Sequence, residues 1–211
     1  MVLNLSKERV LESALLSLAP AIIVFSFIST VTPGPNNLLL AHSGAHFGMR
    51  KTLPHVLGIR CGMVILHLSI LLGLGKVFEV WPVLHQVFTV LAASYIVYMS
   101  IKIATSKQPS ESNKGEPMGL FQAASFQWIN PKSWATLITL GTAFTLSGDL
   151  FWPSALMGII LHQIATLPGT FMWISIGKLV AHKLSDPTFH RRYNLIMGAL
   201  LLASLPLILI A

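Results

Sequence analysis

Two prolines flank a glycine in STVTPGPNNLLLAHSG, residues 29–44, a stretch that is largely apolar and carries no charge. Proline has no backbone N–H, so a helix interrupted there leaves carbonyl groups without partners, and glycine allows backbone dihedral angles that other residues avoid. Two asparagines follow at the start of the next helical segment, where free N–H groups carry a partial positive charge. These groups are suited to bind a carboxylate, and the alternative is a kink that serves packing alone. The predicted binding residues are Pro33, Gly34, Pro35, Asn36 and Asn37.

The sequence WINPKSW, residues 128–134, places a cation in a second apolar stretch. Lys132 lies near the centre of this stretch, where a charge costs at least ~2.5–3.5 kcal/mol on membrane-insertion scales. All seven acidic residues of the chain fall in its tail or loops, so an anionic ligand, backbone carbonyls or water must compensate the ammonium group. The alternative is a lysine that extends to the membrane interface. We predict that Asn130, Pro131 and Lys132 form the counterpart of the first group.

Three further residues are candidates for ion coupling. His67 and His162 each lie well inside an apolar stretch, and imidazole changes its charge near physiological pH. A histidine that is simply hydrogen-bonded between two helices explains them equally well. Arg60 lies nine residues beyond Lys51, so it either takes part in coupling or extends to the interface.

Other chemistry is not expected from these residue types. His42 and His46 have the i, i+4 spacing of metal ligands, but no carboxylate or cysteine completes a set, so no metal site is predicted. The single cysteine, Cys61, rules out an internal disulfide. An enzyme would need a nucleophile or a paired acid and base, which the apolar stretches do not offer. No catalytic residue and no cofactor are therefore predicted.

The composition explains why these polar groups stand out. The 211 residues are 54% hydrophobic and only 10% charged, whereas a soluble domain has about 25% charged residues. Six apolar stretches reach or exceed the ~18 residues that a spanning helix needs. We therefore predict an all-α integral membrane protein with six transmembrane helices, and the net charge of +7 is assigned to loops rather than to nucleic-acid binding. The stretches are residues 13–49, 52–75, 80–101, 117–148, 150–177 and 193–211.

A polar segment divides the chain into two halves of three spans each. Because three is odd, the halves are predicted to insert as inverted repeats, a topology common among transporters. The first span of each half is broken by proline near its midpoint, at Pro33 and at Pro131. The predicted organisation is an amphipathic segment at 1–18, a first repeat at 19–104, a linker at 105–117 and a second repeat at 118–211.

The distribution of basic residues predicts the orientation. Nine Lys and Arg residues fall in the first, third and fifth loops, against three on the other side. Basic loops are retained in the cytoplasm, so both termini are predicted to lie outside. A cleaved signal peptide is not predicted, because residues 1–13 contain four charged residues and no small-residue cleavage site follows a short apolar core.

Small residues and one proline indicate how the spans pack. Gly58 and Gly62 have the small-xxx-small spacing that allows two helices to approach closely. Pro168 and Gly169 are predicted to kink the fifth span, where a hinge would serve a rocking motion.

The motifs TPGPNN in the first span and NPK in the second half, with two groups of three spans, resemble the LysE/RhtB amino-acid exporter superfamily. The segment from Ala92 to Ser106 is similar to the end of the third span in the branch that exports cysteine and O-acetylserine. The resemblance implies export of amino acids or related metabolites across the bacterial inner membrane, driven by a proton or another coupling ion. It also implies that the residues of the two motifs lie on the substrate pathway.

The predicted function is alternating-access export of a small amino acid, with the two halves rocking around a site at the midplane. The absence of acidic residues from the spans argues against a cationic substrate and favours a neutral, zwitterionic one. A passive channel or a membrane scaffold is the alternative, and an intramembrane enzyme is a further one. A homodimer would suit a small six-span protein, but no motif in the sequence specifies it.

Overall fold

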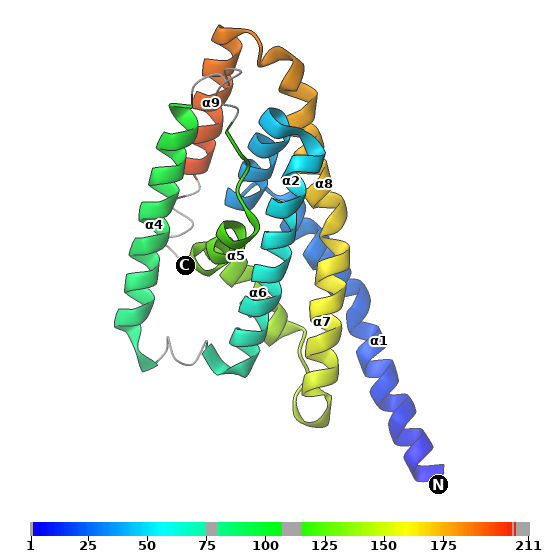
Figure 1. Ribbon diagram of the computed structural model, residues 1–211. Coiled ribbons are helices and arrows are strands. Elements are labelled where there is room, and N and C mark those ends of the chain that lie inside the picture. The colour runs from blue at the N-terminus through cyan, green and yellow to red at the C-terminus, as the bar shows by residue number, and fades with distance from the viewer. Residues whose placement is uncertain (1, 75–79, 107–114, 204, 206–211) are drawn as a thin grey trace.

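The computed structural model describes residues 2–74, 80–106, 115–203 and 205, and every regular element in these ranges is helical (Figure 1). This confirms the all-α prediction. In chain order, the elements are α1 (Val2–Val31), α2 (Pro35–Ser69), η1 (Ile70–Leu74), α4 (Pro82–Ala104), α5 (Leu120–Ile129), α6 (Pro131–Ala143), η2 (Gly148–Leu150), α7 (Phe151–Ala165), α8 (Leu167–Val180), η3 (Ala181–Lys183) and α9 (Pro187–Leu202).

The two proline motifs interrupt helices as predicted. α1 ends at Val31 and α2 begins at Pro35, while α5 ends at Ile129 and α6 begins at Pro131. Proline occupies the first turn of α2 and α6, where its missing N–H costs nothing because that group has no intrahelical partner. Each break therefore joins the carbonyl end of one helix to the amide end of the next.

A third change of direction lies within α2. Gly48 has φ 74° and ψ 175°, a left-handed conformation that favours glycine, and it divides α2 into two straight parts. The bend at Gly48 and the η3 turn lie at one end of the molecule, and η1 and η2 lie at the other (Figure 1).

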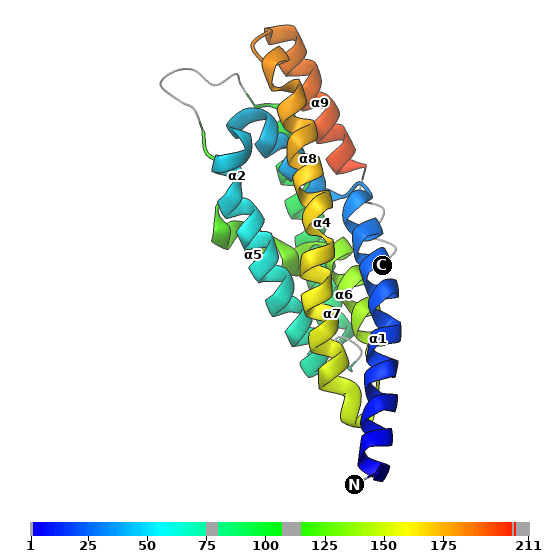
Figure 2. The same cartoon turned by 90° about the vertical axis from the view of Figure 1, so that its right-hand side faces the viewer.

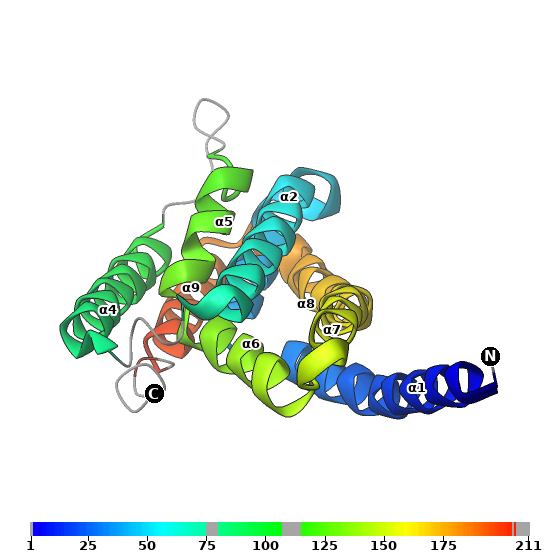
Figure 3. The same cartoon turned by 90° about the horizontal axis from the view of Figure 1, so that it is seen from below.

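α1 is continuous across Leu18, where the predicted amphipathic segment ends, and its N-terminal part projects beyond the other helices (Figure 3).

Two segments of the described chain are long and apolar enough to cross a membrane, Pro35–Leu74 and Gly148–Lys183. Leu15–Val31 and Ala93–Ala104 are shorter apolar helices. The predicted sixth span runs to Ala211, and residues 204 and 206–211 lie outside the described part of the chain. The count of six spans and the inverted repeat stay predictions.

Polarity is distributed as in a protein that is surrounded by lipid. Large apolar side chains on the outside are widely exposed, as at Phe121 (84%) and Leu179 (72%). Several polar side chains are instead fully buried, among them Ser26, Gln127 and Asn194. Such an arrangement leaves the polar groups to bond with one another between helices.

Helix backbones touch at glycines. α2 and α8 run side by side (Figure 2). A Cβ atom on Gly44 would lie 2.3 Å from the carbonyl oxygen of Ile174, and a Cβ atom on Gly177 would lie 1.9 Å from the carbonyl oxygen of Ala41. α2 also packs on α5, where Cβ atoms on the glycines at 58 and 62 would lie 2.3 Å and 2.5 Å from backbone oxygens of α5. The predicted close packing of this glycine pair is confirmed.

We predict that Gly177→Ala destabilises the protein, because the new methyl group overlaps the backbone of α2 and the helices must separate. Overpacking of this kind costs about 1–3 kcal/mol, which should lower the Tm in detergent by about 5 °C. Gly158→Ala is the matched control, because a Cβ atom at Gly158, also helical and buried, would meet nothing within 4 Å. Equal Tm values for the two variants would refute the backbone contact.

Candidate functional site

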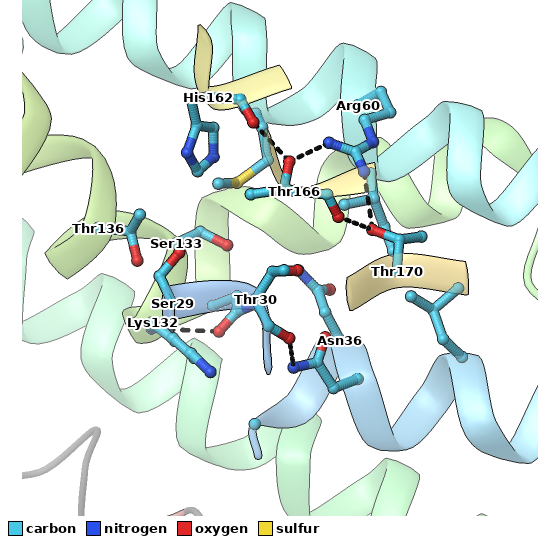
Figure 4. A pocket seen from close by; sticks show the side chains of 16 residues that line it. Ser29, Thr30, Asn36, Arg60, Lys132, Ser133, Thr136, His162, Thr166 and Thr170 are labelled. Atoms are coloured by element: carbon cyan, nitrogen blue, oxygen red, sulfur yellow. Dashed lines mark hydrogen bonds between the residues drawn. The ribbon is translucent and has the colours of Figure 1, made fainter. Parts of the chain in front are cut away.

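Both helix breaks open onto one cavity in the interior of the bundle. The cavity contains about 530 Å³ of space between atoms, part of it open to solvent. Figure 4 shows its polar side chains, which come from α1, α2, α6, α7 and α8. Of the predicted site residues, the following line it: Gly34, Asn36, Asn37, Arg60, Asn130, Lys132 and His162.

The first break leaves the last carbonyl groups of α1 without helical partners, and side chains from other helices bind them. Asn37 donates from Nδ2 to the carbonyl oxygens of Thr30 and Thr32, at 2.7 Å each. Trp173 of α8 donates from Nε1 to the same Thr30 oxygen at 3.1 Å. Asn37 therefore has a structural role at the end of α1 as well as a place in the cavity wall.

Lys132 binds this same helix end across the cavity. Its Nζ atom donates to the carbonyl oxygen of Thr32 at 2.6 Å, to the Thr32 hydroxyl at 2.8 Å and to the carbonyl oxygen of Pro33 at 3.2 Å. The C-terminal end of a helix carries a partial negative charge, which stabilises the ammonium group there. The sequence left an anionic ligand, backbone carbonyls or water as partners for the charge of Lys132. In the structure, backbone carbonyl groups take this role.

Gly34 is required for space and not for its dihedral angles. Its φ of 178° is extended and accessible to any residue, so Gly34 does not use the conformational freedom that glycine allows. A Cβ atom there would lie 2.7 Å from Cδ of Lys132 and 3.2 Å from its Nζ. The missing side chain of Gly34 thus gives the lysine its path to the end of α1.

The second break is closed by Asn130. Its side-chain oxygen accepts a hydrogen bond from the backbone N–H of Lys132 at 3.2 Å and so caps α6, with Pro131 in the first turn. Pro33, Pro35 and Pro131 shape the two breaks but do not line the cavity.

Arg60 points into the bundle and does not extend to the interface. It donates to the carbonyl oxygen of Gln163 at 3.0 Å, to the hydroxyl of Thr166 and to the hydroxyl of Thr170 at 2.7 Å (Figure 4). These groups lie where α7 ends at Ala165 and α8 begins at Leu167, so the helix is interrupted just before Pro168, in the stretch where a kink is predicted. The guanidinium group of α2 therefore holds the α7–α8 junction.

The two candidate coupling histidines are both buried, but only His162 lines the cavity. Nδ1 of His162 lies 3.0 Å from the hydroxyl oxygen of Ser26 on α1, so this histidine is hydrogen-bonded between helices. Among the residues that the structure describes, Nε2 of His67 has no hydrogen-bond partner. His162 thus makes the hydrogen bond between helices that a structural role predicts, and it also lines the cavity, as a coupling role requires.

Sequence analysis missed the hydroxyl groups of the cavity. Serine and threonine are frequent in apolar helices, so even the helical spacing of Ser133 with Thr136 and of Thr166 with Thr170 gave no specific signal. It also missed Gln127, which is buried behind the cavity and binds Asn36. The hydroxyl residues that line the cavity are Ser29, Thr30, Ser133, Thr136, Thr166 and Thr170.

The histidines at the edge of the bundle do not assemble a metal site. His42 and His46 stack with ring centroids 4.1 Å apart, and His46 meets His190 of α9. In the described part of the chain, no three residues with metal-binding side chains are arranged to hold an ion.

A membrane-embedded helical bundle with a central cavity of amides, hydroxyls and two cationic groups has the features of a solute transporter. The sequence model of the LysE type translocator family matches residues 27–208. The chain belongs to this family, whose members are translocators, and it is a protein of the bacterial inner membrane.

The chain is also similar to curated bacterial proteins over most of its length. It is 28% identical over 182 residues to the cysteine/O-acetylserine efflux protein of Salmonella typhimurium (strain LT2), covering 84% of this chain and 90% of that protein. It is 26% identical over 190 residues to the protein of the same name in Escherichia coli (strain K12), which covers 88% of this chain and 94% of that protein. No solved structure matches the chain.

We predict that Arg60→Lys lowers the Tm of the purified protein. The planar guanidinium group reaches Gln163 and Thr170 together, whereas a single ammonium nitrogen cannot, and the unpaired groups cost about 1–3 kcal/mol. Arg50→Lys makes the same exchange at an exposed position and should leave the Tm unchanged. An Arg60→Lys protein as stable as the wild type would show that the α7–α8 junction does not depend on this contact.

Proposed function

We propose that this protein exports small neutral amino acids or closely related metabolites, with the substrate held in the cavity between the two helix breaks. The observation that carries the proposal is the meeting of both breaks with Lys132 and Arg60 at one cavity. The names of the relatives, which are efflux proteins for cysteine and O-acetylserine, support a substrate of this size and charge.

The substrate carboxylate is assigned to Lys132 and the start of α2. Nζ of Lys132 is accessible at the cavity and is bound to neutral carbonyl groups of α1. A carboxylate is a stronger acceptor for an ammonium group than a carbonyl, so the lysine can exchange partners when substrate arrives. Asn36 and Asn130 add amide groups nearby, and the proline residues at 33, 35 and 131 keep both helix ends open.

A zwitterion suits the remaining groups of the cavity. Its lining residues include no Asp or Glu, so a second positive charge on the substrate would have no counter-charge. Threonine and serine hydroxyls can instead accept hydrogen bonds from the substrate ammonium group and bond a polar side chain.

Transport is proposed to follow alternating access, driven by a proton or another ion. The similar pairs α1–α2 and α5–α6, each broken at proline, support an inverted repeat. His162 at the cavity, His67 and Arg60 are the proposed coupling residues, since the cavity has no carboxylate to carry a proton. A passive channel is the competing function, and transport against a concentration gradient separates the two.

The first test uses purified protein in liposomes with an imposed proton gradient. We expect gradient-dependent uptake of radiolabelled cysteine or serine, and we expect Lys132→Ala to reduce it by about tenfold or more, as for loss of a charged ligand contact. Lys102→Ala removes an exposed lysine on α4 and should transport normally. Uptake that only equalises concentrations would indicate a channel, and an active Lys132→Ala protein would remove the lysine from the site.

The predicted orientation is tested with single cysteines. In a Cys61→Ser background, Ser185→Cys should be labelled by a membrane-impermeant maleimide only after cells are opened, because its loop is rich in basic residues. Ser147→Cys, at the opposite end of the molecule, should be labelled in intact cells. The reverse pattern would place the termini inside.

A further inference from the structure

We propose that Gln127 is the positioning residue that sets Asn36 and Ser133 for substrate binding, an inference that rests on the transport function proposed above. Gln127 lies in the last turns of α5, just before the second helix break, and its side chain is fully buried. It does not line the cavity, whereas Asn36 and Ser133 do. Its effect on a substrate is therefore exerted through these two neighbours.

Every polar atom of the Gln127 amide is engaged. Its Oε1 atom accepts from Nδ2 of Asn36 and from the hydroxyl of Ser133, at 2.8 Å each. Its Nε2 atom donates to Oδ1 of Asn36 at 3.2 Å and to the carbonyl oxygen of Ala123 at 2.8 Å. Two acceptor sites and two donor hydrogens are all that a primary amide has, so the orientation of Gln127 is fully determined.

This single side chain joins the two breaks. Asn36 stands in the first turn of α2, directly after the first break, and Ser133 stands in the first turn of α6, directly after the second. The amide of Gln127 thus ties together the starts of two helices, through Asn36 and Ser133, which lie 97 positions apart in sequence (133 − 36). A shift of either helix start would break at least one of these bonds.

Close backbone packing prevents Gln127 from adapting. A Cβ atom on Gly62 would lie 2.7 Å from Cγ of Gln127 and 2.5 Å from the carbonyl oxygen of Ala124. The side chain is therefore confined between α5 and the backbone of α2. Confinement together with four hydrogen bonds gives a preorganised support.

The arrangement leaves a defined donor for the substrate. Asn36 uses its oxygen and one Nδ2 hydrogen in the pair with Gln127, so its second Nδ2 hydrogen is left at the cavity wall. Rotation of the Asn36 amide would exchange donor and acceptor and break both bonds at once. Gln127 thereby decides which group of Asn36 meets the ligand.

The test compares Gln127→Met with Gln122→Met in the liposome assay, with initial rates measured over a range of serine and cysteine concentrations. Gln122 lies on the same helix, is exposed and, among the described residues, bonds to the hydroxyl of Tyr95 alone, at 3.2 Å, so it is a matched control. We expect Gln127→Met to raise KM by about tenfold with a much smaller change in Vmax, since it removes ground-state positioning, and Gln122→Met to behave as the wild type.

Gln127→Glu provides a readout that a purely structural role would not give, and it serves if Gln127→Met does not fold. The carboxylate cannot donate to Asn36 or Ala123, whereas the protonated carboxyl group has one donor and nearly the shape of the amide. We expect KM of this variant, relative to the wild type, to fall as internal and external pH are lowered together at a constant gradient.

A double variant tests the route of the effect. If Gln127 acts through Asn36, Asn36→Ala combined with Gln127→Met should have nearly the KM of Asn36→Ala alone. Independent, multiplying effects would overturn that route. Wild-type uptake with an unchanged KM in Gln127→Met, or a pH-independent KM ratio in Gln127→Glu, would overturn the positioning role alone. A wild type that takes up neither amino acid would remove both this inference and the proposed function.

Discussion

The carbonyl groups at the end of α1 are the constraint on which the site depends. In a bilayer, a broken helix is tolerated only where its free backbone groups find partners in the protein or in a water-filled cavity. Here Asn37, Trp173 and Lys132 supply those partners from α2, α8 and α6. One interrupted helix thus draws three others to the same point and leaves a polar cavity among them.

The same requirement accounts for the polar groups around the cavity. Arg60 donates to the carbonyl oxygen of Gln163 near the end of α7, and Asn130 caps the start of α6. Several of the side chains that we propose to bind a solute therefore also stabilise the helix ends. In the proposed mechanism, a substrate exchanges places with backbone groups as partner of these side chains, which would link occupancy of the cavity to the position of α1.

Much of this could be predicted because proline and charge act locally. The positions of Pro33 and Pro131 fix where helices stop, and the cost of a charge in the membrane singles out Lys132 before any contact is known. The bend at Gly48 gave no such signal, since a glycine beside Arg50 and Lys51 is compatible with a loop or a continuous helix. Contacts between residues distant in sequence could not be predicted either. The sequence around Arg60 does not indicate its bond to Thr170, and the sequence around Gln127 does not indicate its bond to Asn36.

The glycine contacts between α2 and α8 limit the ways in which the molecule can change shape. α2 belongs to the first half of the sequence and α8 to the second, yet Gly44 and Gly177 bring their backbones into direct contact. Backbones interlocked at this distance slide or separate only at a high cost in packing. Rocking of the two sequence halves against each other would therefore have to break or slide the contact between α2 and α8 at Gly44 and Gly177.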